Sequence, residues 1–432
     1  MAFDFADLKI VSPKRSQRAQ TGWEGFFPYY AGYPESFARE LLNSAGLPRA
    51  SCILDPWNGS GTTTFAASAL KLDAIGVDIN PVMAIVARAR TLPSSEKDAL
   101  VPLGRELLEK ADRYDGFEPA ADALHSWFGP LTAGWIRRLE RAISTTLVSD
   151  NTRAAGEIQL ISAFAATYYV ALFALCRELA ATFQTSNPTW LKVAKPGERR
   201  AFADRRKLAE RFNALVTGMA STLTHQDGET TDMSSVDLMV ADTAAGLNIQ
   251  RPVDFVLTSP PYCTRIDYTA VTRLQLAVIE PLLTIEKSDL SRSMLGSVRV
   301  PARSIEQSDE WGPACNAFLD AVKSHPSKAS SGYYYKTHLD YFEKMYRSIR
   351  SVSCVMKDGG VAVLVVQDSF YKNINNPLPN IVTEIAGAHG LRLRRRDDFH
   401  LSKTLAGRHP HSRAYRQTFE AVEAVLCFEK IK

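Results

Sequence analysis

The sequence predicts an α/β fold built on a parallel sheet that a long helical segment interrupts. Two observations support this prediction. Strand-like and helix-like segments alternate between residues 51 and 90, and strand-like segments return between residues 236 and 430. From about 95 to 230, only helical patterns are found. Alternating strands and helices are typical of parallel sheets, because a crossover between parallel strands needs a long connection, usually a helix.

Composition and charge restrict the class of protein. Of 432 residues, 45% are hydrophobic and 23% are charged, which is ordinary for a globular chain. The net charge of +4 is compatible with a nucleic-acid partner without requiring one. Six scattered cysteines form no C-x-x-C pair, which argues against a disulfide framework or a zinc site. Without a signal-peptide core or a membrane-length apolar run, we expect a cytoplasmic protein with no membrane association and no metal.

The first strands and helices follow a basic, weakly structured arm at residues 1–20. Residues 34–47 have apolar side chains at helical spacing and end at a Gly and a Pro, which predicts a helix. Two strand–helix pairs follow within residues 21–95. They are SCILDP with TTTFAASALKL, joined by the loop NGSG, and AIGVDIN with PVMAIVARAR, whose helix opens with a proline.

The rest of the sheet is expected after the helical segment. We predict a helical insertion at residues 96–231, because segments such as WIRRLERAI and RRKLAERFNALVTGMASTL have only helical periodicity. Residues 232–432 supply the remaining strands, with a second, irregular insertion at about 263–335. The predicted strands are VDLMVAD, VDFVLTSP, GVAVLVVQDS, LRLRRRDDF and EAVEAVLCFEK.

A loop with two glycines links the first strand to its helix. Gly59 and Gly61 let the backbone turn sharply and approach a ligand closely after Asp55. Asp78 ends the next strand, where a carboxylate can accept both hydroxyls of a ribose. The loop has no G-K-[ST] and no third glycine, so it fits neither a P-loop nor a dinucleotide fingerprint. The pattern therefore favours a nucleoside without a pyrophosphate, such as S-adenosylmethionine, over an ordinary strand–helix turn.

The strand VDFVL ends in the tetrapeptide Ser259-Pro260-Pro261-Tyr262. The two prolines fix the backbone and remove two N–H donors. The Ser259 hydroxyl and the carbonyls of Ser259 and Pro260 remain as acceptors, which suit the two donors of an amino group. Tyr262 provides a ring on which a base can stack. The alternative is a proline-terminated strand followed by a structural tyrosine.

Both segments resemble signature motifs of the amino-group DNA methyltransferases. The resemblance covers DPWNGSGTT (55–63), TSPPY (258–262) and the ribose-binding segment GVDINP (76–81). It implies a further contact of Asp242, in VADTA, with the adenine amino group. It also implies that the Pro-x-x-Phe core of FPYYAGYPESFARELL lines the methionine end of the cofactor. The cofactor-binding residues that the resemblance implies are Pro34, Phe37, Asp55, Gly59, Gly61, Thr62, Asp78, Asn80 and Asp242.

The resemblance implies a Rossmann-like class I methyltransferase sheet with a large helical insertion. The implied activity is site-specific methylation of DNA with S-adenosylmethionine, by catalytic residues Ser259, Pro260, Pro261 and Tyr262. The target is the exocyclic amine of a flipped base. Cytosine N4 is favoured over adenine N6, because Ser-Pro-Pro-Tyr resembles the cytosine-N4 group more.

On this interpretation, residues 21–95 bind the cofactor and residues 232–432 bind the target amine. The insertion at 96–231 is the candidate DNA-recognition region. Double-stranded DNA is the expected partner, and a nuclease or defence-system subunit, as in restriction–modification, is a further candidate. The oligomeric state stays open.

Two features depart from the commonest form of this family. The cofactor motifs precede the catalytic motif, and the large insertion falls between the second and third motif-bearing strands. Two other functions therefore stay open. An RNA methyltransferase of the guanine-N2 type has a similar motif, usually with Asp in place of Ser259. A non-catalytic DNA-binding subunit on the same scaffold is disfavoured by the intact Ser259, Tyr262 and Asp78.

Several segments are candidates for DNA contact, although a basic cluster alone is more typical of a solvated surface. SNPTWLK (186–192) is either a DNA-contacting loop or a helix end. The aromatic run GYYYKTHLDYF (332–342) follows a serine-rich stretch, which predicts a mobile loop ordered by substrate. The basic clusters are Arg199 with Arg200; Arg205, Arg206 and Lys207; Arg392 with Arg394 to Arg396; and Arg408 to Arg416 with histidines.

Overall fold

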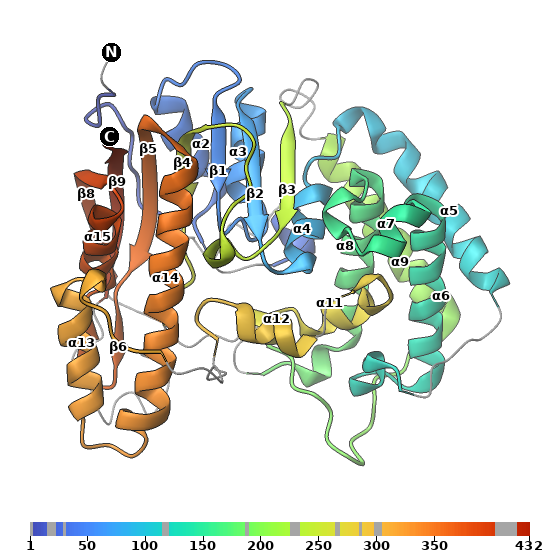
Figure 1. The fold of residues 1–432 in the computed structure, drawn as a ribbon. Helices are drawn as coiled ribbons and strands as arrows, with labels where there is room; N and C mark the ends of the chain where they lie inside the picture. The colour runs from blue at the N-terminus through green and yellow to red at the C-terminus, as the bar shows by residue number, and fades with distance from the viewer. Residues whose placement is uncertain are drawn as a thin grey trace.

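A seven-stranded sheet forms the centre of the computed structural model, in the order β3-β2-β1-β4-β5-β9-β8 (Figure 1). The strands from β3 to β5 are parallel to their neighbours, and β9 is antiparallel to both β5 and β8. The strands are β1 (Cys52–Asp55), β2 (Asp73–Asp78), β3 (Val236–Val240), β4 (Val253–Thr258), β5 (Met356–Gln367), β8 (Leu391–Leu401) and β9 (Ala421–Lys430). The structure describes residues 3–14, 23–28, 32–114, 121–185, 190–224, 234–263, 268–284, 287–297, 305–401 and 421–432.

Helices cover both faces of the sheet because its central strands are apolar on both sides. Successive strand residues point to opposite faces, so Ile53 packs with α2 and α3, whereas Leu54 packs in the core of α13, α14 and α15. These helices are α2 (Glu35–Ser44), α3 (Thr62–Ala69), α13 (Pro313–Ser324), α14 (Tyr335–Val355) and α15 (Leu378–Ala388). The predicted α/β class with a Rossmann-like, mostly parallel sheet is confirmed.

A helical lobe packs beside the sheet on α4 (Pro81–Ala89) (Figure 1). Its central helix is α8 (Ala163–Leu179), whose residues from Ala165 to Cys176 are all buried. A helix that is apolar all round belongs at the centre of a bundle. The surrounding helices are α1 (Trp23–Phe26), α5 (Lys97–Arg113), α6 (Pro130–Leu147), α7 (Asp150–Ala155) and α9 (Arg205–Thr224). The described residues between 96 and 231 form helices and no sheet strand, while the boundaries of the insertion stay a prediction.

The region predicted as irregular, residues 263–335, contains short helices among its described residues. They are α10 (Tyr268–Val271), α11 (Arg273–Val278), α12 (Lys287–Ser293) and the longer α13. Helices of one or two turns leave little periodicity in a sequence, which is why the pattern missed them. Figure 1 shows α11 and α12 lying below the sheet, between the sheet lobe and the helical lobe.

The prediction of a mobile aromatic loop at 332–342 is wrong, because this run forms a π-helical turn and the start of α14. Its Tyr341 and Phe342 are buried. The preceding serine-rich turn is held by hydrogen bonds from Ser330 to Ser327 (2.7 Å) and to the hydroxyl of Tyr371 (2.5 Å). Tyr371 belongs to the hairpin of β6 (Ser369–Tyr371) and β7 (Ile374–Asn376).

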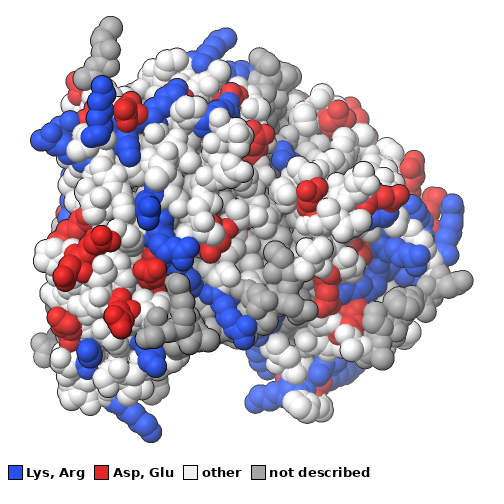
Figure 2. Space-filling model, viewed as in Figure 1, with Lys and Arg blue, Asp and Glu red and all other residues white. Residues whose placement is uncertain are grey.

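The surface view shows the molecule hollowed at its lower edge, between the sheet lobe and the helical lobe (Figure 2). Among the helices that the structure describes, none is long and apolar enough to cross a membrane.

Candidate active site

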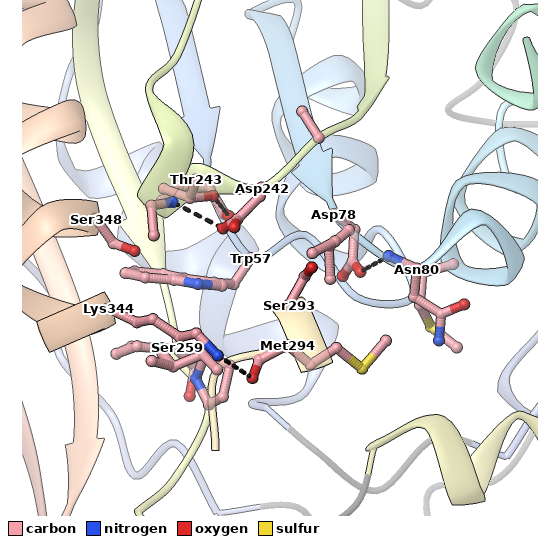
Figure 3. A pocket seen from close by; sticks show the side chains of 18 of the residues that line it. Trp57, Asp78, Asn80, Asp242, Thr243, Ser259, Ser293, Met294, Lys344 and Ser348 are labelled. Atoms are coloured by element: carbon pink, nitrogen blue, oxygen red, sulfur yellow. Dashed lines mark hydrogen bonds between the residues drawn. The ribbon is translucent and has the colours of Figure 1, made fainter. Parts of the chain in front are cut away.

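A pocket lies at the carboxyl ends of four adjacent strands, where ligands bind in parallel α/β sheets. Its volume is about 840 Å³, including space open to solvent. Each strand supplies wall residues: Trp57 after β1, Asp78 at the end of β2, Asp242 after β3, and Ser259 after β4. Figure 3 shows these four side chains around one space. The two segments that resemble methyltransferase motifs are therefore brought together in one pocket.

Asp55 joins the cofactor loop to the catalytic loop without lining the pocket. Its buried carboxylate accepts hydrogen bonds from the hydroxyls of Thr63 and Thr258, both 2.6 Å long. The backbone N–H of Trp57 donates a third bond of 3.2 Å. Burial raises the Asp55 pKa to about 6, against these hydrogen bonds, which lower it. Because Thr258 directly precedes Ser259, Asp55 fixes one loop relative to the other.

Asp78 lines the pocket at the end of β2. Its carboxylate accepts the backbone N–H of Gly59 at 2.9 Å and that of Asn80 at 2.8 Å. Burial raises the Asp78 pKa to about 6, although both backbone bonds favour the ionised form. A carboxylate oxygen can accept more than one hydrogen bond, so Asp78 retains capacity for the hydroxyls of a ribose.

Asn80 and Asp242 also line the pocket, and each lies two residues after a strand and caps the next helical turn. The Asn80 side chain accepts the N–H of Val82 at the start of α4 and donates to the Thr272 hydroxyl at 2.9 Å. Asp242 accepts the N–H of Ala244 at 2.9 Å. These bonds hold both side chains in place before any ligand binds.

The other predicted cofactor residues lie behind the wall of the pocket. Gly61 has φ +80°, and a Cβ there would lie 2.7 Å from the Cβ of Ala87, so this position allows α3 and α4 to approach closely. Phe37 is fully buried against the ring of Tyr33, and Pro34 caps α2. Direct cofactor contacts stay a prediction for the residues outside the lining, which are Pro34, Phe37, Asp55, Gly59, Gly61 and Thr62.

All four residues of Ser259-Pro260-Pro261-Tyr262 line the pocket. Two neighbours hold the end of this segment. The Tyr341 hydroxyl of α14 donates to the Pro261 carbonyl at 2.8 Å, and the Tyr262 hydroxyl donates to the Glu423 carboxylate of β9 at 3.3 Å. Burial raises the Glu423 pKa, and the bond from Tyr262 opposes this shift. The rigid segment therefore has support on both sides.

Sequence reasoning missed the part of the wall that α12 and α14 supply. The Lys344 ammonium donates to the carbonyls of Arg292 (2.8 Å) and Met294 (3.3 Å) and to the Asp340 carboxylate (2.8 Å). It thereby holds the end of α12 over the pocket, as Figure 3 shows for the bond to Met294. No sequence signal marked Lys344 or Ser348, because only the packing of α14 brings them to the motifs. Trp57 lies in the segment DPWNGSGTT, and its aromatic side chain was the one feature of the sequence that could have indicated its place in the pocket.

The candidate phosphate contacts divide into paired and exposed groups. Arg394, Arg395 and Arg396 form ion pairs with Glu429, Asp397 and Asp398 respectively, so this edge of the sheet is largely neutralised. The cluster from Arg408 to Arg416 lies outside the described residues, as do residues 186–189 of the segment SNPTWLK. Trp190, at the end of that segment, is half-buried.

Comparisons with known proteins relate this chain to DNA methyltransferases. Residues 5–87 match the family model described as DNA methylase. The chain is 24% identical over 272 residues to the type II methyltransferase M.BsoBI of Geobacillus stearothermophilus, which covers 58% of this chain and 51% of that protein. The chain thus spans about half the length of this curated relative. A solved rRNA methyltransferase, aviRa from Streptomyces viridochromogenes, aligns over 96% of both chains at 13% identity and a TM-score of 0.29, too weak a similarity to bear on function.

Proposed function

We propose that this chain, which belongs to the amino-group DNA methyltransferase family, methylates the exocyclic amine of a base flipped out of duplex DNA. The observation that supports this most strongly is the pocket, because it brings Asp78 and Ser259-Pro260-Pro261-Tyr262 to one cavity. A nucleoside cofactor and an amine acceptor can therefore meet there.

The lining of the pocket fits S-adenosylmethionine, the methyl donor of this family. Asp78 provides an acceptor for ribose hydroxyls, and Ile79 and Met83 provide apolar surface for an adenine ring. Asp242 also lines the pocket and is the proposed acceptor for the adenine amino group. The only cation in the described lining, Lys344, is neutralised by Asp340, so the pocket favours a positively charged ligand.

When bound, S-adenosylmethionine would supply an activated methyl group to the amine. The chain's own contribution is to orient the amine. The Ser259 hydroxyl and the Pro260 carbonyl each accept a hydrogen bond from one N–H group of the amine. This arrangement directs the nitrogen lone pair away from the base ring. Tyr262 stacks on the base, and the wall from α12 excludes water. Among the two amines, we favour cytosine N4, because Ser-Pro-Pro-Tyr resembles that group more.

This proposal extends to the biological setting. Because a type II methyltransferase is among the relatives, we place the chain in a restriction–modification or related defence system, with a nuclease as its functional partner.

Transfer of labelled methyl groups from S-adenosylmethionine to duplex DNA by the purified chain tests the proposed activity. We expect Ser259→Ala and Tyr262→Ala to lower the rate by about 100-fold or more while leaving cofactor affinity within about threefold, because both residues orient the amine. Tyr114→Ala, at the end of α5 and outside the pocket, is the control with unchanged rate. Loss of cofactor binding in both active-site variants would show that the catalytic segment is misassigned.

A further inference from the structure

A rigid, exposed surface lies on the helical lobe, outside the pocket. It consists of residues 125–132 and 190–207 and is called the platform below. Backbone hydrogen bonds join its two segments: the Ala194 N–H donates to Ser126 O (3.1 Å), and the Ala201 N–H donates to Trp127 O (2.8 Å). The Gly129 N–H donates back to Ala201 O at 3.0 Å. Most of the platform is neither helix nor sheet, yet hydrogen bonds hold its two segments together along their length.

Side chains add further links inside the platform. The Arg200 guanidinium donates to the carbonyls of His125 (2.8 Å), Lys195 (3.1 Å) and Glu198 (2.6 Å). The predicted role of Arg200 as a phosphate contact is therefore replaced by a structural one. The indole N–H of Trp127 donates to Lys192 O at 3.0 Å. These bonds fix the conformation in which the remaining side chains are displayed.

The platform exposes large apolar side chains. Leu131 is 77% exposed, Phe202 is 62% exposed and Val193 is 41% exposed. They are three of the five exposed large hydrophobic residues among the described part of the chain. Leu131 and Phe202 lie on neighbouring backbone segments, because Thr132 and Ala203, the residues that follow them, are joined by hydrogen bonds of 3.1 and 3.3 Å. Adjacent apolar side chains on a fixed surface mark an interaction site more often than isolated ones do.

The platform is also strongly basic. Residues 190–207 contain seven Lys or Arg and two acidic residues, a net charge of +5 in a chain whose total is +4. Lys192 and Lys207 pair with Glu198 and Asp204 inside the segment. Arg205 and Arg206 pair with Asp112 and Glu210 outside it. Lys195 and Arg199 are exposed and form no ion pair with any residue that the structure describes. Such charge disfavours a second copy of this surface and favours a polyanion.

The platform has a fixed position relative to the pocket. It includes the first turn of α6, and Arg137 of α6 donates to the carbonyls of Ala277 and Val278, both at 2.7 Å. Those carbonyls end α11, which begins directly after the pocket residue Thr272. Figure 1 shows the connection between α8 and α9 at the lower end of the helical lobe, facing the same side as the lower ends of α13 and α14. The hollow between the lobes in Figure 2 lies between them.

We propose that the platform binds duplex DNA beside the flipped base, with Lys195 and Arg199 on phosphates and Phe202 and Leu131 against bases or sugars in a groove. This inference rests on the proposed function and adds the surface that holds the duplex. Cations beside an apolar wedge are the combination by which proteins bind and deform a groove. Rigidity favours this use, because few side chains need to be ordered on binding.

Fluorescence anisotropy with a labelled DNA duplex and the full chain tests the proposal. We expect the double variant Phe202→Ala/Leu131→Ala to weaken binding by about tenfold or more, the loss typical of a stacked or wedged apolar contact. The single variant Phe202→Trp, with Leu131 unchanged, should keep most of the wild-type affinity, because tryptophan preserves an aromatic surface at this position. Ile431→Ala, an apolar side chain that is 42% exposed on the sheet lobe, is the control with unchanged affinity.

The salt dependence of binding tests the basic residues separately. We expect Lys195→Ala/Arg199→Ala to reduce the slope of log K against log[salt] by about 2, because two phosphate contacts release fewer counterions. The double variant Lys71→Ala/Lys357→Ala should keep the slope, because Lys71 precedes β2 and Lys357 lies at the start of β5, at the end of the parallel strands opposite the pocket. A melting temperature equal to that of the wild type excludes unfolding as the cause.

The outcomes separate this inference from the proposed function. Unchanged affinity and unchanged slope in both platform variants would overturn the platform as the DNA surface while duplex binding by the wild type stands. Failure of the wild type to bind any duplex would instead contradict the proposed function. Tighter binding to vesicles of phosphatidylglycerol than to the duplex would assign the platform to a lipid surface and overturn the inference.

Discussion

Burial raises the pKa of two carboxyl groups, Asp55 and Asp78, to about 6, yet the two residues have different roles. Asp55 accepts hydrogen bonds from Thr63 and Thr258 and joins two loops. Asp78 faces the pocket and retains capacity for a ligand. The same residue type therefore positions the loops in one place and, in the proposed function, binds the cofactor in the other. Sequence reasoning identified both residues, but it could not separate these roles, because the partners of Asp55 come from β4 and α3.

The pKa of Asp78 predicts how cofactor binding depends on pH. Below about 6 the carboxyl group becomes protonated, which replaces a hydrogen-bond acceptor by a donor and removes a negative charge. Affinity for S-adenosylmethionine should therefore fall as the pH is lowered through about 6. Titration calorimetry across this pH range measures the affinity. We expect Asp78→Asn to bind S-adenosylmethionine weakly and with a flatter dependence on pH. A pH-independent wild type would contradict the assignment of Asp78.

The same shift has the opposite sign for folding stability. Burial raises the Asp78 pKa in the folded chain above its ordinary value of 3.8, so the folded state binds the proton more readily than the unfolded state does. The cost of burying the charged carboxylate is present at neutral pH and is relieved as the pH falls through about 6. Weaker cofactor binding at low pH can therefore be distinguished from acid unfolding.

The approach of α3 to α4 is the element-scale feature that shapes the cofactor loop. We expect Gly61→Ala to lower the free energy of unfolding by about 1–3 kcal/mol, because φ is +80° and the new Cβ would overlap Ala87. Gly387→Ala, in α15 with no atom within 4 Å of the new Cβ, is the matched control and should be neutral or slightly stabilising. Urea unfolding measures both, and equal stability of the two variants would refute the close-packing role.

How well the sequence predicted each helix or strand depended on the length and burial of that element. Each of the seven strands overlaps a segment that the sequence predicted as a strand, and the central strands were the clearest, because buried strands form continuous apolar runs. The short helices α10 to α12 were missed, since so few turns leave no clear period. Lys344 and Ser348 of α14 were missed for another reason. Their place in the pocket depends on packing between segments that are far apart in the chain, and no local pattern encodes it.

At the scale of the whole molecule, total charge says little about where DNA binds. The basic cluster of the edge strand β8 is neutralised by ion pairs with its neighbours. Residues 190–207 carry a net charge of +5, and although four of their seven cations pair with acidic residues, Lys195 and Arg199 are exposed and form no ion pair with any described residue. Sequence reasoning named several basic clusters but could not rank them, because ion pairing and exposure are properties of the folded chain.

The helical lobe and the sheet lobe have complementary parts in this account. The sheet lobe has the pocket proposed to hold the cofactor and the target amine at one end of its parallel strands, and the helical lobe presents the platform. Arg137 joins the two through α11, so the distance from the platform to the pocket is set by packing. That distance would determine which base of a bound duplex reaches Tyr262.

The most direct test of methylation at an exocyclic amine is the analysis of genomic DNA from a host that lacks DNA methylation and expresses this chain. Nucleosides from its digested DNA are separated and weighed by mass spectrometry. The account predicts that N4-methylcytosine appears with the wild-type chain and is absent with Tyr262→Ala. Detection of N6-methyladenine in place of N4-methylcytosine would support methylation of an exocyclic amine but change the target base to adenine. The absence of both modified bases, from cells whose purified chain binds S-adenosylmethionine and duplex DNA, would contradict the central claim.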